Sequence, residues 1–232
     1  MGTPFYLYKL TPVLIMTLFI TINIVLFTER GTYSSIIHIL KEGEEGEKGL
    51  SDWQVGVLAS IFMAGFMFTC PLAAHFSQHV HPFRLMTLGL LIWSIACMSF
   101  RITKQFNVLV FLRALTGVGE AGFISLAPAV IVDSAPANRK TVYMGIFFVF
   151  IPVGVAIGFI YGELIAEITG DWTWAFAVLG FIMAGLTILI GLTYPDPKFA
   201  VRKDTEQDEL GKNVEGEASE QAASPPTLSL GK

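Results

Sequence analysis

Charged residues are scarce in this chain: Asp, Glu, Lys and Arg together make up 15% of its 232 residues. A soluble domain usually carries about 25%, because its surface must be wetted. The charges are also unevenly spread, since Arg113 and Glu120 are the only ones within residues 107–132 and none lies within residues 142–161. The composition therefore excludes an ordinary soluble enzyme.

The chain also has few basic residues and few cysteines. The net charge is −4 and Lys and Arg form no stripe, so the sequence excludes a nucleic-acid partner. Cys70 and Cys97 are the only two cysteines, which excludes a disulfide framework. Both lie inside apolar runs, where a buried thiol behaves as a small hydrophobic group.

Long hydrophobic runs are abundant instead, and they predict an all-α membrane protein. Hydrophobic residues make up 53% of the chain, and about 20 apolar residues in a helix cross about 30 Å of hydrocarbon. The first run follows Lys9 directly and is too long for the core of a signal peptide, so we expect it to stay in the mature protein. Six transmembrane helices are predicted, over residues 10–27 (with a possible extension to residue 40), 52–74, 84–100, 106–132, 141–165 and 172–194.

The Lys and Arg residues of the short loops predict the orientation, because cytoplasmic loops carry more of them. With a cytoplasmic N-terminus, seven fall inside and four outside. We therefore expect both termini in the cytoplasm, with the acidic loop of residues 42–47 and the loop of residues 163–171 outside. The inner set is Lys9, Arg84, Arg139, Lys140, Lys198, Arg202 and Lys203, and the outer set is Lys41, Lys48, Arg101 and Lys104.

The composition changes after Pro197, and this change predicts two regions. Residues 1–197 form the six-helix transmembrane domain. Residues 198–232 are rich in Glu, Gln, Ser, Gly and Pro and have few bulky apolar side chains. Such a segment cannot bury enough surface to offset its ordering entropy, so we expect a disordered cytoplasmic tail.

Arg113 and Glu120 are the first candidate site residues. A charge in the middle of a membrane costs roughly 3 kcal/mol, so it usually faces a cavity or a partner. Seven residues are two helical turns, which place both side chains on one face about 10 Å apart. Gly117 lies between them and leaves room for a ligand or another helix. Either the face lines a substrate path, with Arg113 as the anion site, or these are structural ion pairs or an Arg113 that reaches the outer interface.

Glu29 and Arg30 are the second candidate pair. If the first helix stops near Phe27, both residues sit at the outer interface, where charge is ordinary. If the helix runs on to Leu40, Glu29 lies within the membrane and could carry a proton by cycling between its charged and neutral forms. Periodicity alone leaves these alternatives open.

Small residues mark the fifth predicted helix as a close-packing element. Gly154, Gly158 and Gly162 form a ridge that lets a neighbouring backbone approach, just after Pro152. The proline lacks an N–H, so it frees a carbonyl and favours a kink. Pro128 is expected to act in the same way in the fourth helix.

Two patterns resemble cofactor or metal sites without meeting their requirements. Residues 117–122 fit G-x-G-x-x-G, but the apolar run continues where a dinucleotide-binding fold needs a second strand. His75, His79 and His81 cluster in one loop, but no Cys or carboxylate lies nearby. We therefore predict no cofactor, no metal and no catalytic residues.

Taken together, these motifs resemble the Spinster family of the major facilitator superfamily. The strongest match is RALTGVGEA at residues 113–121, in the fourth predicted helix. Glu29-Arg30-Gly31 stands where the family has Asp-Arg-Gly in its first helix, which favours the intramembrane position of Glu29. Other matching positions follow in the expected order: Pro128, Asp133, Arg139, residues 151–154, Gly158, Gly162, residues 172–176 and residues 195–197.

One departure from the family concerns the loop between the second and third helices. The superfamily usually has an acidic residue there, which helps to latch the inward-closed state through charge contacts. Gln78 replaces that acid. Because Gln78 cannot form a salt bridge, the resemblance implies a weaker or differently built latch.

The second departure is length, since members of the family have twelve helices in two halves and this sequence has six. In such carriers the substrate site lies between the halves, and one half rocks on the other. Three interpretations follow: a truncated chain that lacks its C-terminal half, a homodimer that rebuilds two halves, or a remnant that does not transport. We expect the first.

The resemblance implies transport of an amphiphilic lipid, a lysophospholipid or sphingolipid, across the plasma membrane or an endolysosomal membrane. Arg113 would hold the anionic headgroup, while Glu29 would be the protonation site and Glu120 would support it. The alternative is a six-helix scaffold or regulatory subunit that does not transport and that pairs with another carrier. An enzyme is not expected, because no Ser-His-Asp set or carboxylate pair occurs at usable spacing.

Overall fold

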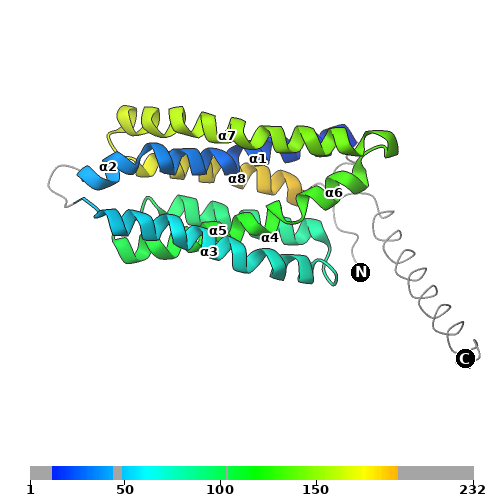
Figure 1. Ribbon diagram of the computed structural model, residues 1–232, viewed down its shortest axis with the longest axis horizontal. Helices are drawn as coiled ribbons and strands as arrows, with labels where there is room; N and C mark the ends of the chain where they lie inside the picture. Colours follow the sequence, from blue (N-terminus) through cyan, green and yellow to red (C-terminus); the bar gives the residue numbers. More distant parts are fainter. Residues whose placement is uncertain (1–11, 44–48, 103, 193–232) are drawn as a thin grey trace, which may run out of the picture. The chain divides into compact units, whose positions relative to one another are not determined.

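The computed structural model describes residues 12–43, 49–102 and 104–192, and these residues are helical except for short connections (Figure 1). The predicted tail and the acidic loop of residues 44–48 lie outside the described part. The helices are α1 (Pro12–Ser35), α2 (Ile37–Glu42), α3 (Asp52–Phe76), α4 (Pro82–Ser99), α5 (Phe106–Ile124), α6 (Ala127–Ser134), a short 3-10 helix (Ala137–Arg139), α7 (Lys140–Thr169) and α8 (Thr173–Leu192).

Within the described residues, six segments are long and apolar enough to cross a membrane, which confirms the predicted number of spans. The fourth consists of α5 and α6, separated by the turn at Ser125 and Leu126. Pro128 is near the start of α6 and cannot donate a backbone hydrogen bond to the preceding turn. The first span continues past Glu29 and Arg30 to Ser35, so the shorter version of this helix is wrong.

Figure 1 shows the helices in two groups, one of α1, α7 and α8 and the other of α3, α4 and α5. Helices α1 and α7 contact each other closely, α3 and α4 both pack on α5, and α4 joins the groups through α8. The α1–α3, α4–α5 and α7–α8 connections share one end of the bundle, which we call the α2 end.

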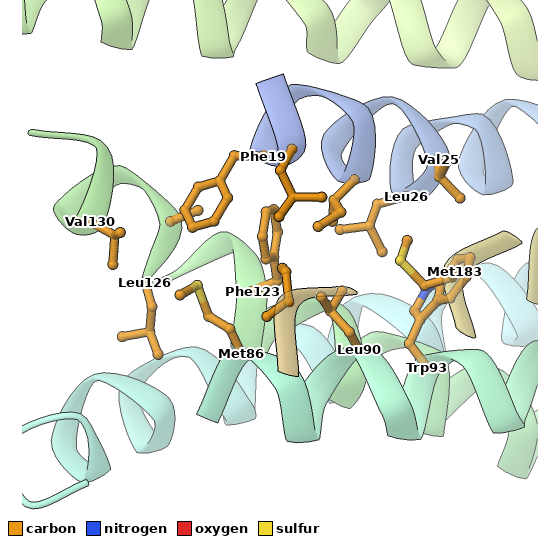
Figure 2. Packing of buried hydrophobic residues seen from close by; sticks show 14 of the residues in the cluster. Phe19, Val25, Leu26, Met86, Leu90, Trp93, Phe123, Leu126, Val130 and Met183 are labelled. Atoms are coloured by element: carbon orange, nitrogen blue, oxygen red, sulfur yellow. The ribbon is translucent and has the colours of Figure 1, made fainter. Parts of the chain in front are cut away.

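A buried apolar core fills the space between the groups (Figure 2). Phe19 of α1 meets Phe123 of α5 edge to face, with ring centroids 5.3 Å apart. Met86, Leu90 and Trp93 lie one turn apart on α4, and all three are fully buried. The 3.6-residue period thus brings one face of α4 against the opposite group.

Glycines set the distance between α1 and α7, as the ridge on α7 predicts. The Cα of Gly158 lies against the backbone of α1 at Thr28 and Gly31, and Gly154 faces Ile24. Polar side chains of α1 use this proximity: Asn23 donates to the carbonyl of Phe147 at 2.9 Å. Gly154, Gly158 and Gly162 therefore all lie against α1, on the part of α7 that follows Pro152.

Replacing Gly158 with leucine should destabilise the bundle, because the new side chain would collide with the backbone of α1. Overpacking of this kind costs about 1–3 kcal/mol and more where backbone cannot shift. Gly145 on the same helix is the matched control, since a side chain there meets open space. Thermal unfolding in detergent should show a lower midpoint for Gly158→Leu than for Gly145→Leu. Equal midpoints would contradict the close packing of α1 on α7.

Candidate functional site

Four charged side chains form two ion pairs inside the bundle, and we call them the charge cluster. Glu29 and Arg30 come from α1, and Arg113 and Glu120 come from α5. Arg113 Nη1 donates a hydrogen bond to Glu29 Oε1. Arg30 Nη2 donates to Glu120 Oε1 at 2.6 Å. Glu29 and Arg30 are adjacent on α1, and their partners Arg113 and Glu120 are two turns apart on α5.

Burial distinguishes the members of the charge cluster. The side chains of Glu29 and Glu120 are fully buried, and that of Arg113 is 4% exposed. The side chain of Arg30 is 24% exposed, so it is the most exposed member of the cluster. Two acids and two bases cancel in charge, which lowers the cost of holding them in an apolar interior.

Aromatic rings surround both guanidinium groups. The Cζ of Arg113 lies 3.9 Å from the ring centre of Tyr33. The Cζ of Arg30 lies 4.8 Å and 4.9 Å from the ring centres of Phe27 and Phe62. A cation over a ring face is attracted by about 0.5–2 kcal/mol. The rings therefore help to hold both arginines in position.

Several polar atoms of the charge cluster have no hydrogen-bond partner among the described residues. They are one carboxylate oxygen of each acid and the Nε of each arginine. An unpartnered buried polar atom is costly, and it usually marks a place where a proton, a water molecule or a ligand group binds. The cluster can thus accept a proton on either acid and an anion beside either arginine.

Glycine positions α5 for this arrangement. Gly117 lies between Arg113 and Glu120 on the helix face and packs against the backbone of α3 at Phe62. Of the two alternatives for Gly117, room for a ligand or for a helix, the structure places a helix there. Phe62 in turn is within reach of both guanidinium groups.

A small cavity, about the size of one water molecule, lies beside Arg113 toward the α2 end. Its walls are apolar apart from Arg113 and Tyr33. The hydroxyl of Tyr33 donates to the carbonyl of Val55 at 2.8 Å. The lining residues are Tyr33, Ile36, Leu40, Leu58, Phe100, Leu109, Arg113, Trp172 and Phe176.

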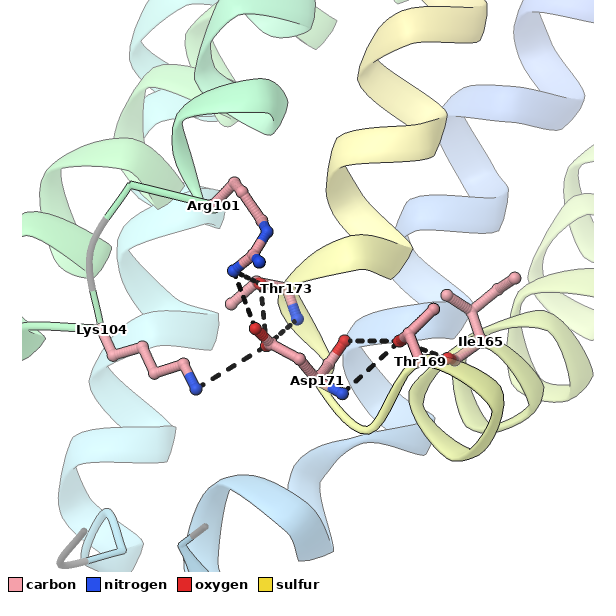
Figure 3. Close-up of polar contacts among 6 residues, drawn as sticks. All are labelled: Arg101, Lys104, Ile165, Thr169, Asp171 and Thr173. Carbon is pink, nitrogen blue, oxygen red and sulfur yellow. Dashed lines mark hydrogen bonds and ion pairs between the residues drawn. The ribbon is translucent and has the colours of Figure 1, made fainter.

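A second polar group, which we call the α2-end clasp, joins two connections of the bundle (Figure 3). It consists of Arg101, Lys104, Asp171 and Thr173. Asp171 accepts from Arg101 Nη1 at 2.8 Å and from the backbone N–H of Thr173 at 3.0 Å. Lys104 Nζ lies 3.7 Å from the same carboxylate. The clasp thereby ties the α4–α5 connection to the first turn of α8.

The partners of Asp171 favour the negatively charged form of its carboxylate. Partial burial alone would raise the pKa of Asp171, but hydrogen bonds from Thr173 and the charges of Lys104 and Arg101 together lower it. A lowered folded-state pKa contributes stability that is present above the unfolded pKa of about 4. This stability is lost as the pH falls through the folded pKa.

Replacing Asp171 with asparagine should therefore lower the thermal midpoint by the same amount throughout the range from pH 8 to pH 5. The difference from the natural protein should shrink as the pH falls below about 4, because the unfolded state takes up a proton there while folded Asp171 is still charged, and it should be lost below the folded-state pKa. Thermal unfolding at a series of pH values measures this difference. Persistence of an unchanged difference at pH 2.5 would show that the Asp171 carboxylate charge does not stabilise the clasp.

Gln78 lies away from the charge cluster, at the end of the bundle opposite the α2 end. Gln78 is exposed in the turn between α3 and α4, where its backbone N–H bonds to the carbonyl of His75. The rings of His75 and His79 are 5.7 Å apart. Within the described residues, no group of three His, Cys, Asp or Glu side chains is placed to hold a metal ion. The effect of Gln78 on a latch stays a prediction.

Sequence reasoning missed Tyr33, Phe62 and the α2-end clasp. Tyr33 follows Glu29 by four residues, so helical spacing alone places both on one face of α1. That signal was present in the sequence. No comparable signal joins Arg101 to Asp171, because they are 70 residues apart and meet only when two loops fold together.

Comparison with known proteins now places the chain in a family. The model of the Major Facilitator Superfamily matches residues 13–230. The chain belongs to this superfamily. Its members are transporters rather than enzymes, as the sequence predicts, and the six apolar helices make the chain an integral, multi-pass membrane protein.

Within the major facilitator superfamily, the chain is Spinster-like. It is 35% identical over 193 residues to the probable sphingolipid transporter spinster homolog 1 of Arabidopsis thaliana, covering 78% of this chain and 39% of that protein. It is 35% identical over 171 residues to protein spinster homolog 3 of Danio rerio, covering 72% and 33%. The chain thus spans less than half the length of these curated relatives.

A solved structure shows the same major facilitator fold. It is a bacterial homolog of the human lysosomal transporter Spinster, in an inward-facing and occupied conformation. The TM-score is 0.68 at 19% sequence identity, and the match covers 84% of this chain and 46% of that one. The six helices of this chain therefore correspond to about half of that fold.

Proposed function

We propose that this chain forms one six-helix half of a secondary transporter for an amphiphilic lipid with an anionic headgroup. The observation that carries the proposal is the charge cluster, two ion pairs buried in a membrane-spanning bundle. Intramembrane charges are rare, and they usually mark a substrate or proton path. The names of the Arabidopsis thaliana relatives, probable sphingolipid transporters, support a sphingolipid as the substrate, and a lysophospholipid is the other amphiphilic lipid that we consider.

Arg113 is the residue that we assign to the headgroup. Its Nε has no hydrogen-bond partner among the described residues, and its Nη1 is held by Glu29. A phosphate group can accept two parallel hydrogen bonds from a guanidinium, which makes arginine well suited to it. Arg30 is the more exposed arginine, so an incoming headgroup meets Arg30 first and Arg113 once Glu29 releases it.

Glu29 is the protonation site in this proposal. Protonation removes its negative charge and weakens its hold on Arg113, so a proton and an anionic headgroup bind together. Glu120 supports the cycle by holding Arg30 in the same way. Glu29 is fully buried, so water must reach it before it can titrate.

The acyl chain and the second half complete the proposed carrier. Helices α3 and α7 expose many apolar side chains, among them Met67, Phe68 and Ile160. Such faces suit membrane lipid, an acyl chain or another six-helix unit. Transport requires a second half, either a C-terminal half of the same protein or a second copy in a homodimer. We assign both termini of this half to the cytoplasmic side, and the carrier to the plasma membrane or an endolysosomal membrane.

Uptake into proteoliposomes by the intact carrier, with its second half present, tests the proposal. The probe is radiolabelled lysophosphatidylglycerol, whose phosphodiester keeps one negative charge from pH 4 to pH 8, and monoacylglycerol is the uncharged control. We expect uptake of the charged lipid only, and loss of that uptake in both Arg113→Ala and Glu29→Gln. Arg84→Ala, which removes an exposed charge at the start of α4, should transport normally. Uptake that survives both cluster substitutions would overturn the assignment of roles.

A further inference from the structure

Two layers of side chains and a small cavity separate the Glu29–Arg113 pair from the α2 end of the bundle. The outermost layer is the α2-end clasp, in which the side chains of Arg101 and Lys104 are 45% and 28% exposed. The next is a group of three rings, Phe100, Trp172 and Phe176, which we call the aromatic plug. The cavity beside Arg113 lies innermost.

The aromatic plug is closely packed and almost fully buried. Phe100 and Phe176 stack with ring centres 4.8 Å apart, and Trp172 meets Phe176 edge to face at 6.0 Å. All three rings are at most 6% exposed. The ring centre of Phe176 lies 5.8 Å from the Cζ of Arg113, so the plug covers the guanidinium directly.

Residues of the clasp are adjacent in sequence to residues of the plug. Arg101 directly follows Phe100, and Asp171 directly precedes Trp172. The 2.8 Å bond between Arg101 and Asp171 therefore holds two of the three rings together from outside. The guanidinium of Arg101 also lies 4.8 Å from the ring centre of Trp174, which adds a second tie between the connections.

The unpartnered Nε of Arg113 indicates which ligand the cavity behind the plug would bind. Arg113 is 3% exposed, and its Nε has no hydrogen-bond partner among the described residues. The cavity that it lines has space for about one water molecule. A water molecule there could accept from Nε and lie beside the charge pair. The walls are otherwise mostly apolar and the space is small, so with the plug closed this cavity holds water rather than a lipid headgroup.

We propose that the aromatic plug, held shut by the α2-end clasp, controls the access of water and protons from the α2 end to the Glu29–Arg113 pair. The cavity between plug and pair is a water site on this route. The use of the route for coupling rests on the proposed role of Glu29 as the protonation site. The gating role of the plug does not depend on Glu29, because it requires only that the rings separate when the clasp opens.

Cys97 is a natural reporter for the plug. It is fully buried on α4, three residues before Phe100, and thus lies one turn deeper in the bundle. The experiment uses the full chain in lipid nanodiscs with Cys70→Ser, and a water-borne thiol reagent, 2-aminoethyl methanethiosulfonate. Mass spectrometry measures the rate at which Cys97 is modified. No lipid substrate and no transport are needed, so the result is independent of the proposed function.

Opening the clasp should expose Cys97. We expect Asp171→Asn and Arg101→Gln each to speed its modification by about tenfold, which corresponds to about 1.4 kcal/mol. Lys41→Gln is the matched control, because it removes a different ion pair, with Asp52, at the same end. It should leave the rate unchanged.

A second thiol distinguishes an opened plug from a loosened bundle. Cys70 lies on α3, one to two turns from the end of that helix opposite the α2 end. In a Cys97→Ser background, Asp171→Asn should leave the modification rate of Cys70 unchanged. An unchanged rate at Cys97 in both clasp variants, or an equal rise at Cys70 and Cys97, would overturn the proposal.

Discussion

Replacing Arg113 with leucine should lower the free energy of unfolding by about 3–5 kcal/mol, the usual cost of leaving a buried charge without its partner. Glu29 is fully buried and accepts its one hydrogen bond from Arg113. Without Arg113, Glu29 must take up a proton or remain charged in an apolar interior. Unfolding by sodium dodecyl sulfate in mixed micelles measures the loss.

The double variant separates the ion pair from the rest of the packing. Glu29→Gln removes the charge that Arg113→Leu leaves unpaired, so the double variant should be more stable than Arg113→Leu alone. Arg84→Leu is the surface control, and surface substitutions usually change stability by less than about 0.5 kcal/mol. If Arg113→Leu costs no more than Arg84→Leu, the pair does not stabilise the bundle.

Glu29→Gln should make the binding of lysophosphatidylglycerol insensitive to pH and as tight as that of the natural protein in acid. Glutamine has the shape of a protonated glutamate and cannot hold Arg113 by charge. Arg113 is then available to the headgroup at every pH. Ligand-dependent thermal stabilisation of the chain in nanodiscs, from pH 8 to pH 5, measures the affinity. Monoacylglycerol is the control, because its affinity should not depend on pH in either protein.

The sequence predicts the fold well because membrane insertion imposes a length and a polarity on each helix. The six spans follow from apolar runs of about 20 residues, and the α7 ridge follows from glycines at a spacing of four. The turn at Ser125 and Leu126 is less predictable. Pro128 signals an irregularity in that helix, but a helix can bend at proline without ending.

The sequence singles out the residues that form the candidate site, but it does not predict which carboxylate pairs with which arginine. Spacing places Arg113 and Glu120 on one face of α5, and that part needs one helix only. Glu29 and Arg30 are adjacent on α1, so their side chains point about 100° apart. Which carboxylate meets which arginine depends on how α1 lies beside α5. The clasp of Arg101 and Asp171 depends on packing in the same way.

The pH dependence of lysophosphatidylglycerol binding by the natural protein tests the central claim most directly. In our account, a proton on Glu29 and a headgroup on Arg113 bind together. The affinity should therefore rise as the pH falls from 8 to 5, by at most about tenfold per pH unit for one linked proton. The Glu29→Gln variant should lose this rise. An affinity that does not change with pH in the natural protein, or a rise that persists in Glu29→Gln, would contradict the account.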